Sequence, residues 1–261
     1  MKLVALPAFT DNYIWMLHDG SQAVVVDPGD AAPVLDALQT LNLSLSAILV
    51  THHHPDHTQG LTALKPVLQG PVYGPLHEPI AGVDLAVTGG HAFSLLGLSW
   101  TVWDTPGHTA GHIGYIAQPN SELPCPGSLV FCGDTLFSAG CGRLFDGTHE
   151  QLLGSLDRYG ELPDDTCFCP THEYTLANLS FASAVEPGND SVKAATARCD
   201  ALRARGEPTL PTTLAVEKQI NPFLRCRHPD VVAQALAHGA RDASALAVFT
   251  ALRQWKNQFK A

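Results

Sequence analysis

The stretch that decides the fold is Ile48-Leu-Val-Thr-His-His-His-Pro-Asp-His57. It opens with the end of a short apolar run, residues 47–50, whose length and β-branched content are typical of a buried strand. A polar loop follows at once, with four histidines and one aspartate in six residues. Loops at the carboxyl ends of strands are where α/β proteins place ligands and catalytic groups. The stretch therefore predicts an α/β protein with a metal site at the end of a strand.

The spacing inside this loop favours two metals over one. On an extended chain His52 and His54 point the same way, whereas Asp56 and His57 reach a second position from the following turn. A catalytic zinc takes three protein ligands and keeps its fourth position open, so these four side chains are too many for one such ion. We expect His53 to bind no metal.

Three further apolar runs are each followed by a side chain of the same chemistry: residues 98–103 by His108, residues 129–132 by Asp134 and residues 166–169 by His172. Imidazole and carboxylate groups suit zinc and related divalent ions. A turn or a helix cap is the alternative role for Asp134. His112 begins the next strand and is expected to support a ligand. Asp27, at the end of run 23–26, is expected to do the same or to form the turn Asp27-Pro28-Gly29.

The rest of the first 170 residues repeats this pattern of short apolar runs, broken by Pro, Gly, Asp and Asn. We expect strands at 3–6, 13–17, 23–26, 47–50, 98–102, 113–117, 129–132 and 166–169, and helices at 32–41, 57–64 and 149–159. After about residue 175 the apolar spacing becomes helical, over 176–184, 190–205, 230–238 and 243–259. The chain is therefore expected to divide into an α/β catalytic domain, 1–174, and a helical domain, 175–261.

Charge is distributed unevenly along the 261 residues, whose net charge is −10. Residues 1–189 hold four basic and nineteen acidic side chains and eleven of the thirteen histidines, whereas residues 190–261 hold eleven basic and six acidic side chains. The acidic total argues against binding of nucleic acid or anionic membrane through bulk charge. The asymmetry suggests metal chemistry in the first part and anion binding in the second.

Cysteine usage and the lack of targeting signals predict a cytoplasmic protein. The seven cysteines form no C-x-x-C pair, and a chain of this length does not depend on disulfides, so we expect reduced thiols. The N-terminus lacks the apolar core of a signal peptide, and no apolar run approaches the roughly 18 residues of a membrane span.

The ordered set T-H-x-H-x-D-H, then a His, an Asp and a His, resembles the metallo-β-lactamase superfamily over about residues 1–175. The resemblance implies an αββα sandwich with a binuclear metal centre at one edge. It also implies the ligand sets: His52, His54 and His108 for the first ion, Asp56, His57 and His172 for the second, and Asp134 bridging both. Zinc is the expected metal, with iron or manganese as alternatives.

Further segments narrow the resemblance to glyoxalase II, the hydroxyacylglutathione hydrolase family. They are residues 133–147, 171–175, Asn221-Pro-Phe-Leu-Arg225 and 252–259, and with the helical tail they extend the match to nearly the whole chain. The family hydrolyses S-(2-hydroxyacyl)glutathione thioesters, such as S-D-lactoylglutathione to D-lactate and glutathione, in the second step of methylglyoxal detoxification. The resemblance implies attack by a metal-bridged hydroxide, with Asp56 and Asp134 as the catalytic carboxylates.

The same resemblance implies a glutathione site built from cationic and aromatic residues: Arg143, Phe145, Tyr174, Arg253 and Lys256. Arg253 and Lys256 are spaced i, i+3, so they share one face of the last helix. Some family members carry Tyr where Phe145 stands and Lys where Arg143 stands. Without the resemblance, these two helical cations would be interpreted as a solvated surface.

We expect a monomer.

Three other interpretations remain open. A lactonase or β-lactamase of this fold leaves the cationic last helix without a role. A persulfide dioxygenase would use glutathione with one iron, which the seven predicted ligands disfavour. A non-catalytic metal-binding or scaffold protein would be marked by loss of ligands, and none is missing from the sequence.

Overall fold

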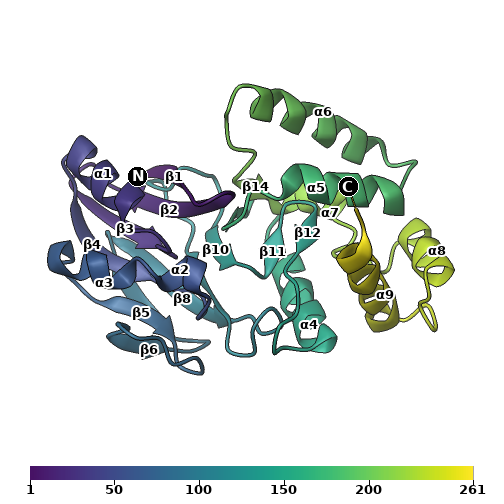
Figure 1. Cartoon of the computed structure of the whole chain (residues 1–261), viewed down its shortest axis with the longest axis horizontal. Coiled ribbons are helices and arrows are strands. Elements are labelled where there is room, and N and C mark those ends of the chain that lie inside the picture. The colour runs from purple at the N-terminus through teal and green to yellow at the C-terminus, as the bar shows by residue number, and fades with distance from the viewer. Residues whose placement is uncertain (261) are drawn as a thin grey trace.

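The structure, a computed structural model, describes residues 1–260 and contains two six-stranded sheets (Figure 1). The first has the order β1-β2-β3-β4-β5-β6 and consists of β1 (Lys2–Ala8), β2 (Asn12–His18), β3 (Gln22–Val26), β4 (Ser44–Leu49), β5 (Val72–Pro75) and β6 (Leu85–Val87). The second has the order β14-β13-β10-β9-β8-β7 and consists of β7 (Ala92–Leu95), β8 (Leu98–Asp104), β9 (Ile113–Ala117), β10 (Leu129–Gly133), β13 (Cys167–Pro170) and β14 (Thr212–Thr213). A separate two-stranded hairpin pairs β11 (Leu136–Phe137) with β12 (Gly140–Cys141).

Alternation of side chains along the strands places the two sheets face to face. In β2, Trp15 packs into the core between the sheets, while the next residue, Met16, packs into the layer on the opposite face. From the second sheet, Trp100 and Phe131 stack with ring centroids 5.8 Å apart in the inner core. Both faces of β2 are thus covered, which explains why every residue of this strand is buried.

Helices cover the two outer faces, so the αββα arrangement is confirmed. Helices α1 (Ala32–Leu41) and α3 (Leu61–Leu64) pack on the first sheet, α4 (His149–Gly160) packs on the second, and α9 (Ala245–Gln258) packs against α4. The remaining helices are α2 (Pro55–Thr58), the 3₁₀ turn η1 (Lys65–Val67), α5 (Thr175–Val185), α6 (Asp190–Ala204), α7 (Leu214–Ile220) and α8 (Pro229–Ala237). Helices α5 to α9, green to yellow in Figure 1, lie on the side of β11 and β12 and away from β3 to β6.

The structure differs from the sequence-based expectation in three places. The single helix expected at 57–64 is two short helices, because the Gly60 amide between them donates to the Pro28 carbonyl oxygen at 3.0 Å and so leaves the helical hydrogen-bond pattern. The C-terminal segment is helical, with one addition: β14 joins the second sheet beside β13. The short strands β5, β6, β7, β11 and β12 and helix α7 were not predicted. Within residues 1–260, no helix is long and apolar enough to cross a membrane.

Candidate metal centre

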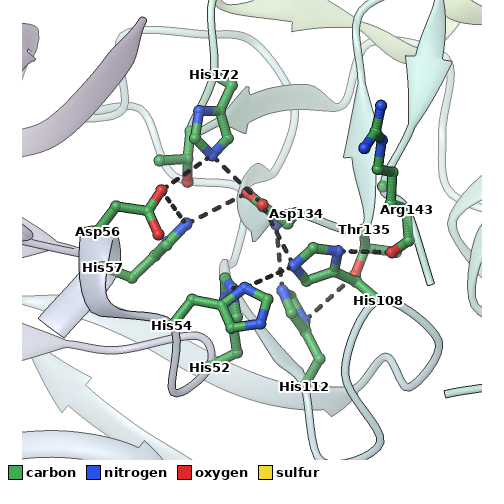
Figure 2. Close-up of polar contacts among 12 residues, drawn as sticks. His52, His54, Asp56, His57, His108, His112, Asp134, Thr135, Arg143 and His172 are labelled. Carbon is green, nitrogen blue, oxygen red and sulfur yellow. Dashed lines mark hydrogen bonds and ion pairs between the residues drawn. The ribbon is translucent and has the colours of Figure 1, made fainter. Parts of the chain in front are cut away.

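The predicted ligands converge at one edge of the sandwich, where the strands of both sheets end (Figure 2). The loop after β4 and helix α2 supply His52, His54, Asp56 and His57, while His108 precedes β9, Asp134 follows β10 and His172 follows β13. Their candidate ligand atoms form two groups, each within 4.8 Å: His52, His54 and His108 in one, and Asp56, His57 and His172 in the other. Asp134 lies between the groups, because it forms a third such group with His52 and His57.

In the first group three ring nitrogens face one another. His54 Nδ1 lies 3.0 Å from His52 Nε2 and 3.1 Å from His108 Nε2. The other ring nitrogen of His52 lies 3.0 Å from Thr51 Oγ1, and that of His108 lies 2.7 Å from the Arg143 carbonyl oxygen. The partnered nitrogens fix the orientation of both rings, which leaves the converging nitrogens available to a cation.

In the second group two imidazoles face two carboxylates. His57 Nε2 lies 3.6 Å from Asp56 Oδ2 and 3.5 Å from Asp134 Oδ1. His172 Nε2 lies 3.5 Å from Asp56 Oδ2 and 3.4 Å from Asp134 Oδ2. These distances are longer than those of good hydrogen bonds. They leave space between nitrogen and oxygen atoms that point toward a common position.

Two aspartates lie beside the outer nitrogens of these imidazoles. Asp27 Oδ2 lies 3.1 Å from His57 Nδ1, and Asp11 Oδ1 lies 2.7 Å from His172 Nδ1. A carboxylate behind a histidine fixes its tautomer and orientation for metal binding. The supporting role suggested for Asp27 fits this contact, whereas Asp11 was missed because it lies in a loop with no motif.

Unsatisfied buried atoms support the fit of this site to cations. His57 Nε2 and Asp134 Oδ1 are buried and form no hydrogen bond with any residue in 1–260. Buried polar atoms without partners are costly, and a set of imidazole and carboxylate donors suits zinc, iron or manganese. The residues present therefore fit divalent metal ions.

Burial and the neighbouring carboxylates shift the pKa values of these side chains in opposite directions. Burial lowers the pKa of His52 well below its usual value, and burial also lowers the pKa of His54 and His108. Burial opposes a positive charge on His172, but the carboxylates of Asp134 and Asp11 outweigh it and raise its pKa to about 9. Burial likewise opposes ionisation of Asp134, yet His172 and His57 hold the pKa of that carboxyl below its usual range. Asp134 is therefore a carboxylate surrounded by groups that compensate its charge.

Two histidines near the centre belong to neither group. His112 is buried; its Nε2 accepts a hydrogen bond from the Asp134 amide at 3.2 Å, and its Nδ1 lies 2.9 Å from Thr105 Oγ1. His53 lies 2.7 Å from Glu78 through Nδ1. Glu78, which sequence reasoning missed, also accepts from the amides of His53 at 2.7 Å and Gly111 at 3.0 Å. It thus ties the two histidine-bearing loops together.

A cavity of about 550 Å³ opens beside the metal centre. The predicted substrate-binding residues Arg143, Phe145, Tyr174, Arg253 and Lys256 line it together with His54, Asp56, His108, Asp134 and His172. Tyr174 stacks on His172 with centroids 4.7 Å apart, and Phe145 packs edge-on against His54 at 4.6 Å. The structure therefore brings the predicted metal ligands and the predicted substrate residues to one cavity.

The two cations of α9 differ in their surroundings. Arg253 is buried, donates through Nη1 to the carbonyl oxygens of Cys141 at 2.9 Å and Gly142 at 3.4 Å, and stacks over Phe223. Its Nε is buried and has no partner within residues 1–260. Lys256 is half-buried and donates to the Ala177 carbonyl at 2.8 Å; burial, followed by Arg253, lowers the pKa of its ammonium to about 8. This face of α9 is therefore not the solvated surface of the alternative interpretation.

Comparison with known proteins assigns the family. Residues 8–172 match the metallo-beta-lactamase superfamily, and residues 173–259 match the hydroxyacylglutathione hydrolase C-terminus. The hydroxyacylglutathione hydrolase of Albidiferax ferrireducens is 53% identical over 99% of this chain and 100% of its own. That of Cupriavidus taiwanensis is 50% identical over the full length of both chains.

Solved structures agree on the fold. ETHE1 from Myxococcus xanthus superposes with a TM-score of 0.64 and 26% identity, over 97% of this chain and 98% of its own. TTHA1623, solved in a di-iron-bound form, superposes with a TM-score of 0.57 and 26% identity, over 86% of this chain and 100% of its own. From the matches over its whole length, the chain belongs to the hydroxyacylglutathione hydrolase family of the metallo-β-lactamase superfamily.

Proposed function

We propose that this chain hydrolyses S-(2-hydroxyacyl)glutathione thioesters, S-D-lactoylglutathione among them, to a 2-hydroxy acid and glutathione. The observation that carries the proposal is the shared cavity: five of the seven metal-type donors line one part, with His52 and His57 buried behind them, and three cations line another. The relatives identical at 53% and 50% over full length are named hydroxyacylglutathione hydrolases. An anionic peptide thioester suits such a cavity, because its carboxylates pair with cations while its carbonyl reaches the donors.

We further propose that the donors hold two divalent ions, with zinc as the expected metal and iron or manganese as alternatives. His52, His54 and His108 would hold one, Asp56, His57 and His172 the other, and Asp134 would contact both. The di-iron form of TTHA1623, 26% identical, supports a binuclear centre on this fold. When bound, such ions lower the pKa of water toward about 7 and polarise a carbonyl.

The side chains of the protein would orient the reacting water. Asp56 and Asp134 each face both His57 and His172, so we propose them as the catalytic carboxylates that orient the attacking water. Hydrolysis adds water across the acyl carbon–sulfur bond, and the sulfur leaves as a thiolate. Because a thiol titrates near 8.5, the thiolate departs without a dedicated acid. That is consistent with a cavity whose carboxylates all lie among the imidazoles.

Glutathione would lie along the cationic wall of the cavity. We assign the glycine carboxylate to Lys256 and Arg253 and further contacts to exposed Arg143. Phe145, which is 66% exposed, lacks a hydroxyl and would contribute an apolar contact only. Tyr174, whose ring stacks on His172, would cover one side of the acyl group.

We also propose a cytoplasmic monomer with no nucleic-acid or membrane partner, divided into domains 1–174 and 175–261. All seven cysteines are free thiols and six are buried, as is usual in a reducing compartment. One chain supplies every donor of the site, so a second copy is not needed to complete it. Helix α5 begins at Thr175, at the proposed boundary.

Turnover of S-D-lactoylglutathione by the metal-loaded chain tests the proposal. Loss of the thioester absorbance should accompany release of free glutathione thiol in a one-to-one ratio. A metal-loaded, folded chain that leaves the thioester intact would sink the assignment. Oxygen-dependent consumption of glutathione persulfide would instead favour the dioxygenase alternative.

A further inference from the structure

The hairpin β11–β12 forms one wall of the cavity, next to the metal centre. It begins two residues after Asp134 and contributes Phe137 and Cys141 to the lining. Two residues beyond the hairpin, the Arg143 carbonyl oxygen lies 2.7 Å from His108 Nδ1. A shift of this hairpin would therefore reshape the substrate-binding wall.

The turn of the hairpin has a backbone that needs outside support. Only two residues, Ser138 and Ala139, connect the strands, and Ala139 has φ +55°. An L-residue rarely adopts this left-handed conformation unaided. Each strand is only two residues long, so few ladder hydrogen bonds stabilise the turn.

The support comes from a buried carboxylate on α7. Glu217 is fully buried, and its Oε1 accepts from Ser138 Oγ at 2.8 Å and Thr212 Oγ1 at 2.7 Å. Its Oε2 accepts from the Ala139 amide at 2.8 Å and from Asn221 Nδ2 at 3.0 Å. Two donors of the turn, the Ser138 hydroxyl and the Ala139 amide, thus share one carboxylate.

Asn221, the first residue of the Asn-Pro-Phe-Leu-Arg segment, completes the support. Its Nδ2 also donates to the carbonyl oxygens of Phe137 at 3.1 Å and Gly140 at 2.9 Å, so it contacts both strands of the hairpin. Asn178 of α5 donates to the Ser138 carbonyl at 3.0 Å. These bonds join residues 40 to 84 positions apart and fix the hairpin to the helices.

We infer that Glu217 and Asn221 are positioning residues for the thioesterase reaction: they hold hairpin 136–141 so that its cavity face is shaped for the glutathione thioester. The inference rests on the proposed function. Neither residue lines the cavity, so both act through the hairpin. The contacts of Glu217 and Asn221 lie at the hairpin and not at the proposed metal ligands. Loss of these contacts should therefore weaken substrate binding and leave the rate of the hydrolytic step nearly unchanged.

Glu217→Gln in the full, metal-loaded chain tests the inference. The amide offers one oxygen where the carboxylate offers two, so one pair of donors loses its acceptor. We expect KM for S-D-lactoylglutathione to rise about tenfold with kcat within about threefold, since uniform binding is lost. Metal content should stay unchanged, and amide hydrogen exchange should accelerate in residues 134–143.

Glu186→Gln is the matched control. Glu186 is also a buried carboxylate of the helical part, paired with Arg225 at 2.7 and 2.8 Å, and it forms no hydrogen bond to 136–143 in the described chain. It should lower the melting temperature without changing KM or hairpin exchange. An equal rise in KM for both variants would overturn the inference, as would an unchanged KM for Glu217→Gln.

Two further outcomes are also decisive. If Glu217→Gln does not fold, Ser138→Ala removes a single donor at the turn, and a KM equal to that of the unaltered chain would refute the positioning role. If the unaltered chain shows no turnover, the proposed function fails on its own. Hairpin exchange then still shows whether Glu217 holds the turn.

Discussion

Replacing Asp27 by Asn probes how the chain orients its metal ligands. Asp27 is buried at the end of β3, where Oδ1 accepts from the Thr51 amide and Oδ2 from Thr51 Oγ1, both at 2.7 Å. Oδ2 also lies 3.1 Å from His57 Nδ1. The Thr51 amide can only donate, so the Asn oxygen must stay at Oδ1 and its NH₂ group must replace Oδ2. His57 Nδ1–H would then meet a donor instead of an acceptor.

The expected loss follows from that mismatch. Partners behind metal-bound histidines contribute about 10- to 100-fold in metal affinity, equivalent to about 1.4–2.8 kcal/mol. We therefore expect Asp27→Asn to weaken one of the two proposed metal sites by this factor, measured by competition with a chromophoric chelator. Asp30→Asn is the control, because Asp30 accepts from the Ala32 amide and pairs with no histidine in residues 1–260. Equal affinities for the two variants would refute the proposed role of Asp27.

Two other perturbations test the cavity and the core. Burial and, to a smaller extent, the positive charge of Arg253 lower the pKa of Lys256 to about 8. This ammonium therefore loses its charge as pH rises from 7 to 9. We expect kcat/KM to fall about three- to tenfold over this range and the fall to be smaller in Lys256→Arg, whose side chain stays charged; an identical fall in that variant would contradict the assignment. Leu156→Ala should destabilise the chain by about 2–5 kcal/mol in urea unfolding, since Leu156 is fully buried between α4 and the second sheet, and a loss below about 1 kcal/mol would contradict the packing described.

The convergence of the proposed metal ligands could be predicted because each follows a strand within a few residues. Strand and loop are local features, and the topology then brings strand ends to one edge without further information. The long, periodic segments 32–41 and 149–159 were recovered for the same reason. Short strands at sheet edges, such as β6, carry too few apolar residues for a clear period.

The supporting residues could not be predicted, because their roles depend on contacts distant in sequence. Asp11 meets His172 across 161 positions, and Glu217 meets Ser138 across 79. Spacing placed Arg253 and Lys256 on one helical face but could not show that Arg253 is buried against the Cys141 carbonyl. Burial of a polar side chain depends on which surface packs against it, which is a property of the folded chain.

Titration of the metal-free chain with zinc tests the central claim most directly. Six donors in two groups around Asp134 predict that hydrolysis of S-D-lactoylglutathione rises with added metal and saturates at two ions per chain. Saturation at a single ion, or equal turnover by the metal-free chain, would contradict the account.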